Sequence, residues 1–162
     1  HYPLRRQRQM CIRDRHGLKL GYFAQEHDLL DMDRTVLENM ASSATDLNET
    51  EMRKILGSFL FTGDDVHKPA GVLSGGEKTR LALATLVVSS ANVLLLDEPT
   101  NNLDPASRAQ VLDAIGNFGG AIVLVTHDEG AVHALDPDRV LVLPDGTEDM
   151  WSADYAELIS LA

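Results

Sequence analysis

The chain has 162 residues, of which 44% are hydrophobic and 24% charged, a composition typical of one globular domain. Its formal net charge of −11 argues against a free-standing protein that coats nucleic acid. The charge is uneven, because residues 1–15 hold five arginines and one aspartate while the remaining 147 carry −15. The single cysteine, Cys11, cannot form an intramolecular disulfide, and no apolar run reaches the roughly 20 residues that cross a bilayer. We therefore expect a cytoplasmic protein without a membrane-spanning segment.

Hydrophobic periodicity predicts alternating strands and helices after the basic segment. In chain order, we expect a strand over residues 18–25, a helix from about Thr35, a helix over 49–60, a loop over 63–71, a helix over 74–90, a strand over 93–96, a helix over 105–118, a strand over 121–125, a helix over 128–135, a strand over 139–143, a turn at 144–146 and a helix from Ser152. This order predicts an α/β fold with a largely parallel sheet. The wholly apolar strands at 93–96 and 121–125 are predicted to be buried on both faces.

Polar side chains follow two of these strands at the point where each strand ends. Asp97 and Glu98 come after one strand, and His127 comes shortly after the next. Ligands of open parallel sheets bind beyond the carboxyl ends of the strands. Adjacent carboxylates on an extended segment point to different sides, so one could hold Mg²⁺ through water while the other deprotonates an attacking water. The alternative is that these polar residues only terminate their strands.

A third candidate site is the segment Ser74-Gly75-Gly76-Glu77. Ser-x-x-Glu is a capping box, which needs no ligand. Capping does not explain the two glycines, each of which costs up to about 1 kcal/mol in a helix relative to alanine. Glycine is useful where a group must approach the backbone closely, and the free N–H groups of a helix start attract anions. The segment is therefore a candidate phosphate site.

Taken together, these segments resemble the ATP-binding cassette ATPases. The string LSGGE (73–77) resembles the signature motif, VLLLDEP (93–99) resembles Walker B with the catalytic glutamate, and NNLD (101–104) resembles the D-loop. His127 resembles the switch histidine, and Gln25 fits the Q-loop. The resemblance covers residues 17–162, and DEPTNNLD with LSGGEKTRLALA is most similar to the second cassette of subfamily F (ABC-F). Members of that subfamily are soluble, carry two cassettes in one chain and often act on ribosomes.

The resemblance implies ATP and Mg²⁺ as ligands and a role for each matched residue. Glu98 would be the general base, Asp97 would hold Mg²⁺ through water, and Gln25 would contact Mg²⁺ and the attacking water. His127 would touch the γ-phosphate. The signature segment would bind a nucleotide held by an opposite cassette, through Ser74, Gly75, Gly76 and Glu77. Asp104 of the D-loop would contact that opposite cassette.

One family motif is missing from the sequence. No G-x-x-x-x-G-K-[ST] phosphate loop occurs in the 162 residues, and the family places that loop upstream of the Q-loop. We therefore expect residues 17–162 to be the C-terminal two-thirds of a cassette, with a helical subdomain at about 35–90 and an open sheet edge. Residues 1–16 are expected to be foreign to the family, and the chain alone is expected not to bind or hydrolyse ATP usefully.

The sequence also allows other interpretations. The arginine-rich segment could be a basic arm for RNA or ribosome contact, or a targeting remnant, instead of foreign sequence. The chain could belong to the ATP-binding subunit of an ABC transporter, which shares the motifs. It could be the carboxy-terminal lobe of a chromosome-maintenance ATPase, although residues 17–73 show no sustained heptads. Finally, it could be a non-catalytic module that only supplies a signature loop or docks to a partner.

Overall fold

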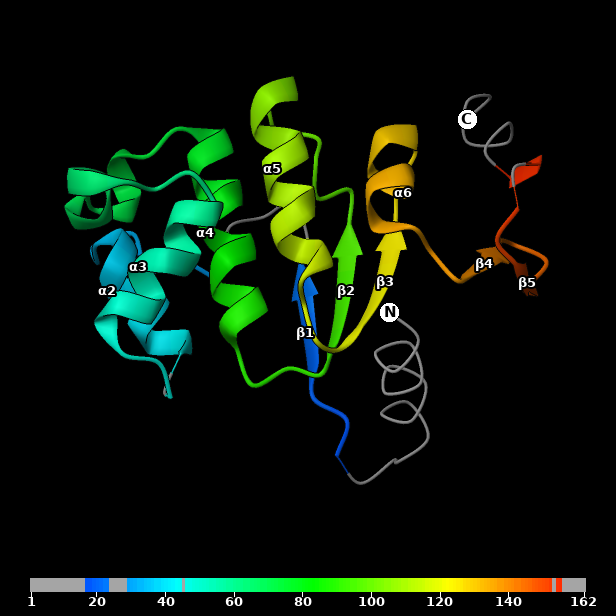
Figure 1. Ribbon diagram of the computed structural model, residues 1–162, viewed down its shortest axis with the longest axis horizontal. Coiled ribbons are helices and arrows are strands. Elements are labelled where there is room, and N and C mark those ends of the chain that lie inside the picture. Colours follow the sequence, from blue (N-terminus) through cyan, green and yellow to red (C-terminus); the bar gives the residue numbers. More distant parts are fainter. Residues whose placement is uncertain (1–16, 24–28, 45, 153, 156–162) are drawn as a thin grey trace.

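A parallel three-stranded sheet forms the centre of the molecule (Figure 1). The computed structural model describes residues 17–23, 29–44, 46–152 and 154–155. Strands β1 (Leu20–Phe23), β2 (Val93–Asp97) and β3 (Ala121–Val125) lie in that order, and all pair in parallel. The predicted α/β fold is thus confirmed. The predicted end of the first strand, Gln25, lies outside the described residues.

The helices begin where capping residues predict. Helix α2 (Val36–Ser43) follows Thr35, and α3 (Glu49–Ser58) follows Asn48; each cap accepts a hydrogen bond from the backbone of a glutamate three residues on. The other helices in the described ranges are α4 (Gly75–Val88), α5 (Pro105–Gly116) and α6 (Glu129–Leu135). The segment expected as a loop at 63–71 contains two short 3₁₀ helices, η1 (Gly63–His67) and η2 (Ala70–Val72).

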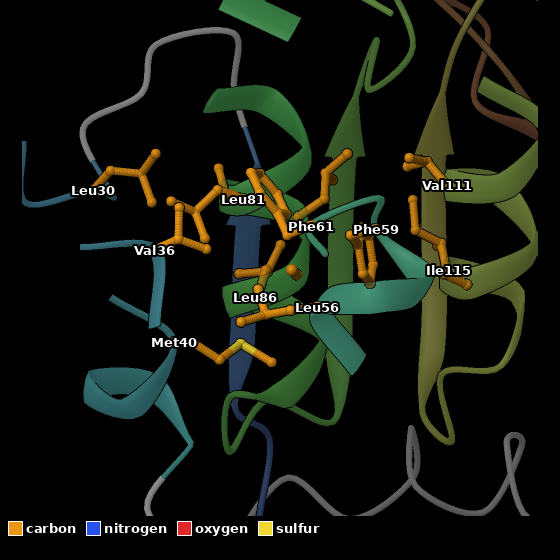
Figure 2. Close-up of a cluster of buried hydrophobic side chains, with 14 of the residues drawn as sticks. Leu30, Val36, Met40, Leu56, Phe59, Phe61, Leu81, Leu86, Val111 and Ile115 are labelled. Carbon is orange, nitrogen blue, oxygen red and sulfur yellow. The ribbon is translucent and has the colours of Figure 1, made fainter. Parts of the chain in front are cut away.

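One hydrophobic cluster joins the helices α2, α3 and α4 to the sheet. The predicted apolar face of α3 enters it through Met52, Leu56 and Phe59, while Ile55 and Leu60 are only partly buried. In Figure 2, Leu56 and Phe59 lie among side chains contributed by α2, α4 and α5. Because α4, which begins with the segment that resembles the signature motif, lies in this shared core, its position relative to the sheet is fixed by close packing.

The two faces of the sheet differ in their covering. Gly21, Phe23, Leu94 and Leu96 are buried, and a Cβ on Gly21 would lie 2.9 Å from the Leu86 side chain of α4. On the other face, Leu20, Tyr22, Val123 and Val125 are about half exposed, with values from 48% to 60%. The prediction that residues 121–125 are buried on both faces is therefore wrong for Val123 and Val125, although Ala121 on the same face is buried.

After α6 the chain forms a separate hairpin. Strand β4 (Arg139–Val142) pairs antiparallel with β5 (Thr147–Met150), a strand that the periodicity did not predict. A turn as short as the one at 144–146 can join only antiparallel strands, which explains the antiparallel pairing of β4 with β5. The predicted helix from Ser152 lies largely outside the described residues. Within the described ranges, every helix is too short or too polar to cross a bilayer.

Candidate functional site

Glu98 leaves the end of β2 in an unusual backbone conformation. Its φ is 46°, in the left-handed region that a glutamate rarely occupies and that costs about 1–3 kcal/mol. Its backbone N–H donates to the carbonyl of Val125 at the end of β3, over 2.9 Å. This bond holds the turn after β2 against the neighbouring strand and places the Glu98 side chain beside the residues that follow β3.

The structure brings Glu98 and His127 together. Glu98 Oε1 accepts hydrogen bonds from the backbone N–H of His127 at 3.0 Å and from its ring Nδ1 at 2.8 Å. An ionised carboxylate only accepts hydrogen bonds, so this contact assigns the proton to Nδ1 and leaves Nε2 for a second partner. The Glu98 side chain is 20% exposed and that of His127 62%, so the pair is open to solvent from the histidine side.

Four further residues surround this pair, and none of them was assigned a role from the sequence. Glu98 Oε2 accepts a hydrogen bond from Thr126 Oγ1 at 3.3 Å. The carboxylate of Asp128 binds Thr100 and Arg108, residues that come from the segment after β2 and from α5. The sequence does show that Thr126 and Asp128 flank His127, and this position could have marked them as residues of the site. It does not show which residues they contact.

Asp97 is the last residue of β2 and is partly buried. Within the part of the chain that the structure describes, no hydrogen bond or ion pair engages its carboxylate, and no group of three His, Cys, Asp or Glu side chains could enclose a metal ion. Mg²⁺ in nucleotide sites is usually held by one or two carboxylates together with the phosphates of the substrate. A single accessible aspartate therefore fits an ion that arrives with a nucleotide. The second predicted ligand, Gln25, lies outside the described residues.

The signature segment forms the predicted capping box at the start of α4. Ser74 Oγ accepts a hydrogen bond from the backbone N–H of Glu77 at 3.3 Å, and Glu77 Oε2 accepts from the Ser74 N–H at 2.8 Å and from its hydroxyl at 2.7 Å. These bonds, that of the hydroxyl first, hold the pKa of Glu77 below its ordinary value of 4.5. The carboxylate is thereby kept ionised and committed to the cap.

The two glycines of this segment have different surroundings. A Cβ on Gly76 would lie 2.8 Å from the backbone carbonyl oxygen of Asn102, whereas a Cβ on Gly75 would meet nothing within 4 Å. Close approach of the chain itself therefore explains Gly76 without a ligand. Only Gly75 keeps the open backbone that suits an approaching phosphate.

Asp104 caps the next helix of the site. Its Oδ1 accepts hydrogen bonds from the backbone N–H groups of Ala106 and Ser107, and the bonds from Ser107 lead the causes that lower its pKa. Ser107 in turn accepts a hydrogen bond from Arg80 of α4 at 3.1 Å. The starts of α4 and α5 are thus joined, with the signature segment beside the NNLD segment. These contacts leave the roles expected for Ser74, Gly75, Gly76, Glu77 and Asp104 as predictions.

A cavity of about 480 Å³ lies away from these motifs. It is lined by the ends of α2, α4 and α5 and by α3, including Ile55, Phe59 and Val88, and by none of the candidate site residues. The candidate site is thus a surface at the strand ends and helix starts, distinct from this cavity.

The chain belongs to the ABC transporter family of ATP-binding cassette proteins, whose sequence pattern matches residues 5–101. The matched span begins inside the basic segment and includes the signature segment and the end of β2. An assignment of residues 1–16 as foreign to the family stays a prediction.

Several curated relatives are similar to this chain. YdiF of Bacillus subtilis is 41% identical over 86% of the chain, YheS of Escherichia coli K12 is 42% identical over 78%, and ABC transporter F family member 5 of Arabidopsis thaliana is 35% identical over 86%. The chain spans about a fifth of the length of these relatives, between 20% and 22%. Among the members of its family, the chain is ABC-F-like.

Two solved structures share the fold. The dimeric, ADP- and phosphate-bound post-hydrolysis state of the ATP-binding cassette MJ0796 superposes with a TM-score of 0.66 at 22% identity, covering 82% of this chain and 63% of that one. An ABC transporter ATP-binding protein from Pyrococcus furiosus gives a TM-score of 0.57 at 24% identity, covering 64% and 55%. These likenesses confirm the cassette architecture.

Proposed function

We propose that this chain supplies the hydrolytic strand ends and the signature helix of a cassette in an ABC-F-type tandem-cassette ATPase. The observation that carries the proposal is the Glu98–His127 pair, held at 2.8 Å next to Asp97 at the end of a parallel sheet. Substrates of open α/β sheets bind at this end. The reaction would be the hydrolysis of ATP, with Mg²⁺ as part of the substrate.

In this proposal Glu98 is the general base. A carboxylate has about four lone-pair sites, and hydrogen bonds from Thr126 and His127 occupy three of them. One site on Oε2 remains to accept a proton from an attacking water. Asp97 would hold Mg²⁺ through water, and His127 would contact the γ-phosphate through the Nε2 that Glu98 leaves unused. Gln25 would contact the ion and the attacking water.

The signature segment would act on a nucleotide held by a second cassette. Ser74, Gly75 and Gly76 would grip its γ-phosphate, Glu77 would keep the helix start in shape, and Asp104 would contact the opposite cassette. The open backbone at Gly75 supports this role, because a phosphate can reach the N–H groups there without displacing protein atoms. Asn102 of the NNLD segment is exposed and lies beside Gly76. An exposed residue at this place suits a contact with the opposite cassette next to the signature segment.

We extend the proposal to the location, partners and domain organisation of the whole protein. We place the cassette in the cytoplasm, in a protein that acts on ribosomes during translation, with residues 17–162 as the C-terminal two-thirds of the cassette and about 35–90 as its helical subdomain. The similarity to an Arabidopsis protein named as an F family member supports the tandem-cassette assignment. The 162-residue chain by itself would be inactive, because it has no phosphate loop to hold the β- and γ-phosphates.

The test compares the full-length gene product with the 162-residue chain. We expect Mg²⁺-dependent, saturable ATP hydrolysis by the former and none by the latter, measured as phosphate release. Ribosome association is tested by sedimentation of the full-length Glu98→Gln variant through sucrose with ATP, where it should travel with ribosomes. Saturable hydrolysis by the chain alone would contradict its predicted inactivity. The transporter alternative would be favoured if the Glu98→Gln variant stays at the top of the gradient and a reconstituted membrane partner stimulates ATP hydrolysis by the wild-type protein.

A further inference from the structure

The carboxylate of Asp128 joins three segments around the candidate catalytic pair. It accepts a hydrogen bond from Thr100 Oγ1 at 2.9 Å and lies 3.1 Å from Arg108 Nη1, and its other oxygen accepts from the N–H of Gly130 at 2.9 Å. Thr100 follows β2 and is 1% exposed, Arg108 lies on α5, and Gly130 lies in the first turn of α6. The aspartate is therefore anchored from three sides and is itself only 15% exposed.

The connection from Asp128 to Glu98 passes through the hydroxyl of Thr126. Thr126 Oγ1 accepts the backbone N–H of Asp128 at 3.0 Å and donates to Glu98 Oε2 at 3.3 Å. A hydroxyl carries one proton, so accepting from Asp128 leaves that proton for the carboxylate of Glu98. The Asp128 side chain thus sets the position of its own backbone N–H, and this N–H sets the direction in which Thr126 donates.

The chain of contacts also determines where His127 lies. Its backbone N–H and its ring are both bound to Glu98 Oε1, and its two neighbours in sequence, Thr126 and Asp128, are the residues that the network fixes. The buried Nε of Arg108 has no hydrogen-bond partner in the described residues, so the Asp128 carboxylate is the group that compensates this guanidinium. Removing the negative charge from Asp128 would free both the arginine and the His127 loop.

We infer that Asp128 is a positioning residue, which acts through Thr126 to hold Glu98 and His127 in the geometry needed to activate water. The inference rests on the proposed ATPase function. Reaction geometry tolerates little displacement, since a shift of about 1 Å can cost about a hundredfold in rate. The nucleotide itself touches neither Asp128 nor Thr126 in this scheme, so nucleotide affinity should not depend on them.

The experiment uses the full-length protein and two matched pairs of variants. Asp128→Asn removes the charge, and Glu129→Gln removes a charge from the adjacent exposed residue of α6. Thr126→Val removes the hydroxyl at nearly constant volume, and Thr126→Ser keeps it. We measure kcat and KM for ATP, the melting temperature, and hydrogen exchange at the His127 amide, whose bond to Glu98 reports the geometry directly.

We expect kcat to fall about tenfold or more in Asp128→Asn and Thr126→Val, with KM within about twofold and faster exchange of the His127 amide. Glu129→Gln and Thr126→Ser should stay within about twofold of the wild type in all three quantities. A purely structural role for Asp128 would leave Thr126→Val active, because that variant retains the Asp128–Arg108 ion pair. If Asp128→Asn and Thr126→Val both keep wild-type kcat and His127 exchange, the inference is wrong.

These measurements distinguish failure of the inference about Asp128 from failure of the proposed ATPase function. An inactive wild-type protein, or a Glu98→Gln variant that hydrolyses ATP at the wild-type rate, would overturn the assignment of Glu98 as the base. Hydrogen exchange at the His127 amide would still test the positioning role of Asp128. Unchanged protection in Asp128→Asn overturns that role, whereas protection that is lost in Asp128→Asn and kept in Glu129→Gln supports it.

Discussion

At the signature helix, Ser74 and Glu77 bind each other across three positions, whereas at the strand ends Glu98 and His127 meet from 29 positions apart. The first arrangement needs only a helix start, and the same pattern recurs at Thr35 and Asn48, where no nucleotide site is expected. The second needs two adjacent strands, a residue at positive φ and a network that includes α5. The comparison suggests that local hydrogen bonds shape the signature segment, while the sheet positions the hydrolytic pair.

The largest effect should come from the strand ends. Glu98→Gln keeps most of the volume of the side chain but removes the basic carboxylate, so we expect ATP hydrolysis by the full-length protein to fall about 10²–10⁴-fold. ATP binding should persist, because the residue does not hold the phosphates. Steady-state phosphate release and equilibrium nucleotide binding measure the two quantities, with Glu129→Gln as the control. Normal turnover by Glu98→Gln would show that another group activates the water.

Alanine variants of the two glycines in the signature segment should distinguish a packing role from a ligand-binding role. Gly76→Ala places a Cβ 2.8 Å from the Asn102 carbonyl, so we expect it to lower the free energy of unfolding by about 1–3 kcal/mol. Gly75→Ala enters open space and should raise that free energy by up to about 1 kcal/mol. Urea denaturation of the chain measures both.

The same pair has a functional counterpart in the full-length protein. If a phosphate approaches the backbone at Gly75, Gly75→Ala should reduce hydrolysis by about tenfold although it stabilises the fold. Full activity of Gly75→Ala would mean that this glycine serves no ligand, and equal stability of the two alanine variants would contradict the difference between their surroundings.

Removal of the helix cap should have a smaller effect. Ser74→Ala deletes the hydroxyl that accepts the N–H of Glu77 and donates to its carboxylate, and we expect a loss of about 1 kcal/mol in the free energy of unfolding. Ser90→Ala, at an exposed position after α4, should change it by less than about 0.5 kcal/mol. If the two variants are equally stable, the capping box contributes nothing to this helix.

The smallest effect is a pH dependence of stability that arises from the same box. The folded pKa of Glu77 lies below its ordinary value of 4.5, so its contribution is complete above pH 4.5 and is lost as the pH falls through the lower folded pKa. Denaturation of the chain between pH 6 and pH 3 should therefore show a smaller slope in Glu77→Gln than in the wild type. An identical slope in the two proteins would contradict the depressed pKa.

The sequence predicted those parts of the site whose causes are local. Thr35, Ser74 and Pro105 mark the starts of α2, α4 and α5, because caps and prolines act within one turn of the chain. The alternation of apolar strands and helices predicted the parallel sheet, and the polar residues after two strands predicted the edge at which the site lies. Where the chain turns back on itself after α6, periodicity failed, because the four residues of β5 are all exposed and only Met150 among them is apolar, which gives no alternation.

Tertiary structure alone decided which groups meet. The sequence could not show that Asn102 occupies the space beside Gly76, that Arg108 on α5 reaches Asp128, or that Glu98 adopts a positive φ against Val125. Each depends on the placement of elements that are distant in sequence and are held by a shared core. The sequence by itself determined the residue types and the order of the elements, since these depend on local hydrogen bonds and hydrophobic periodicity. The close contacts of the catalytic pair and of its supporting network were determined by how those elements pack.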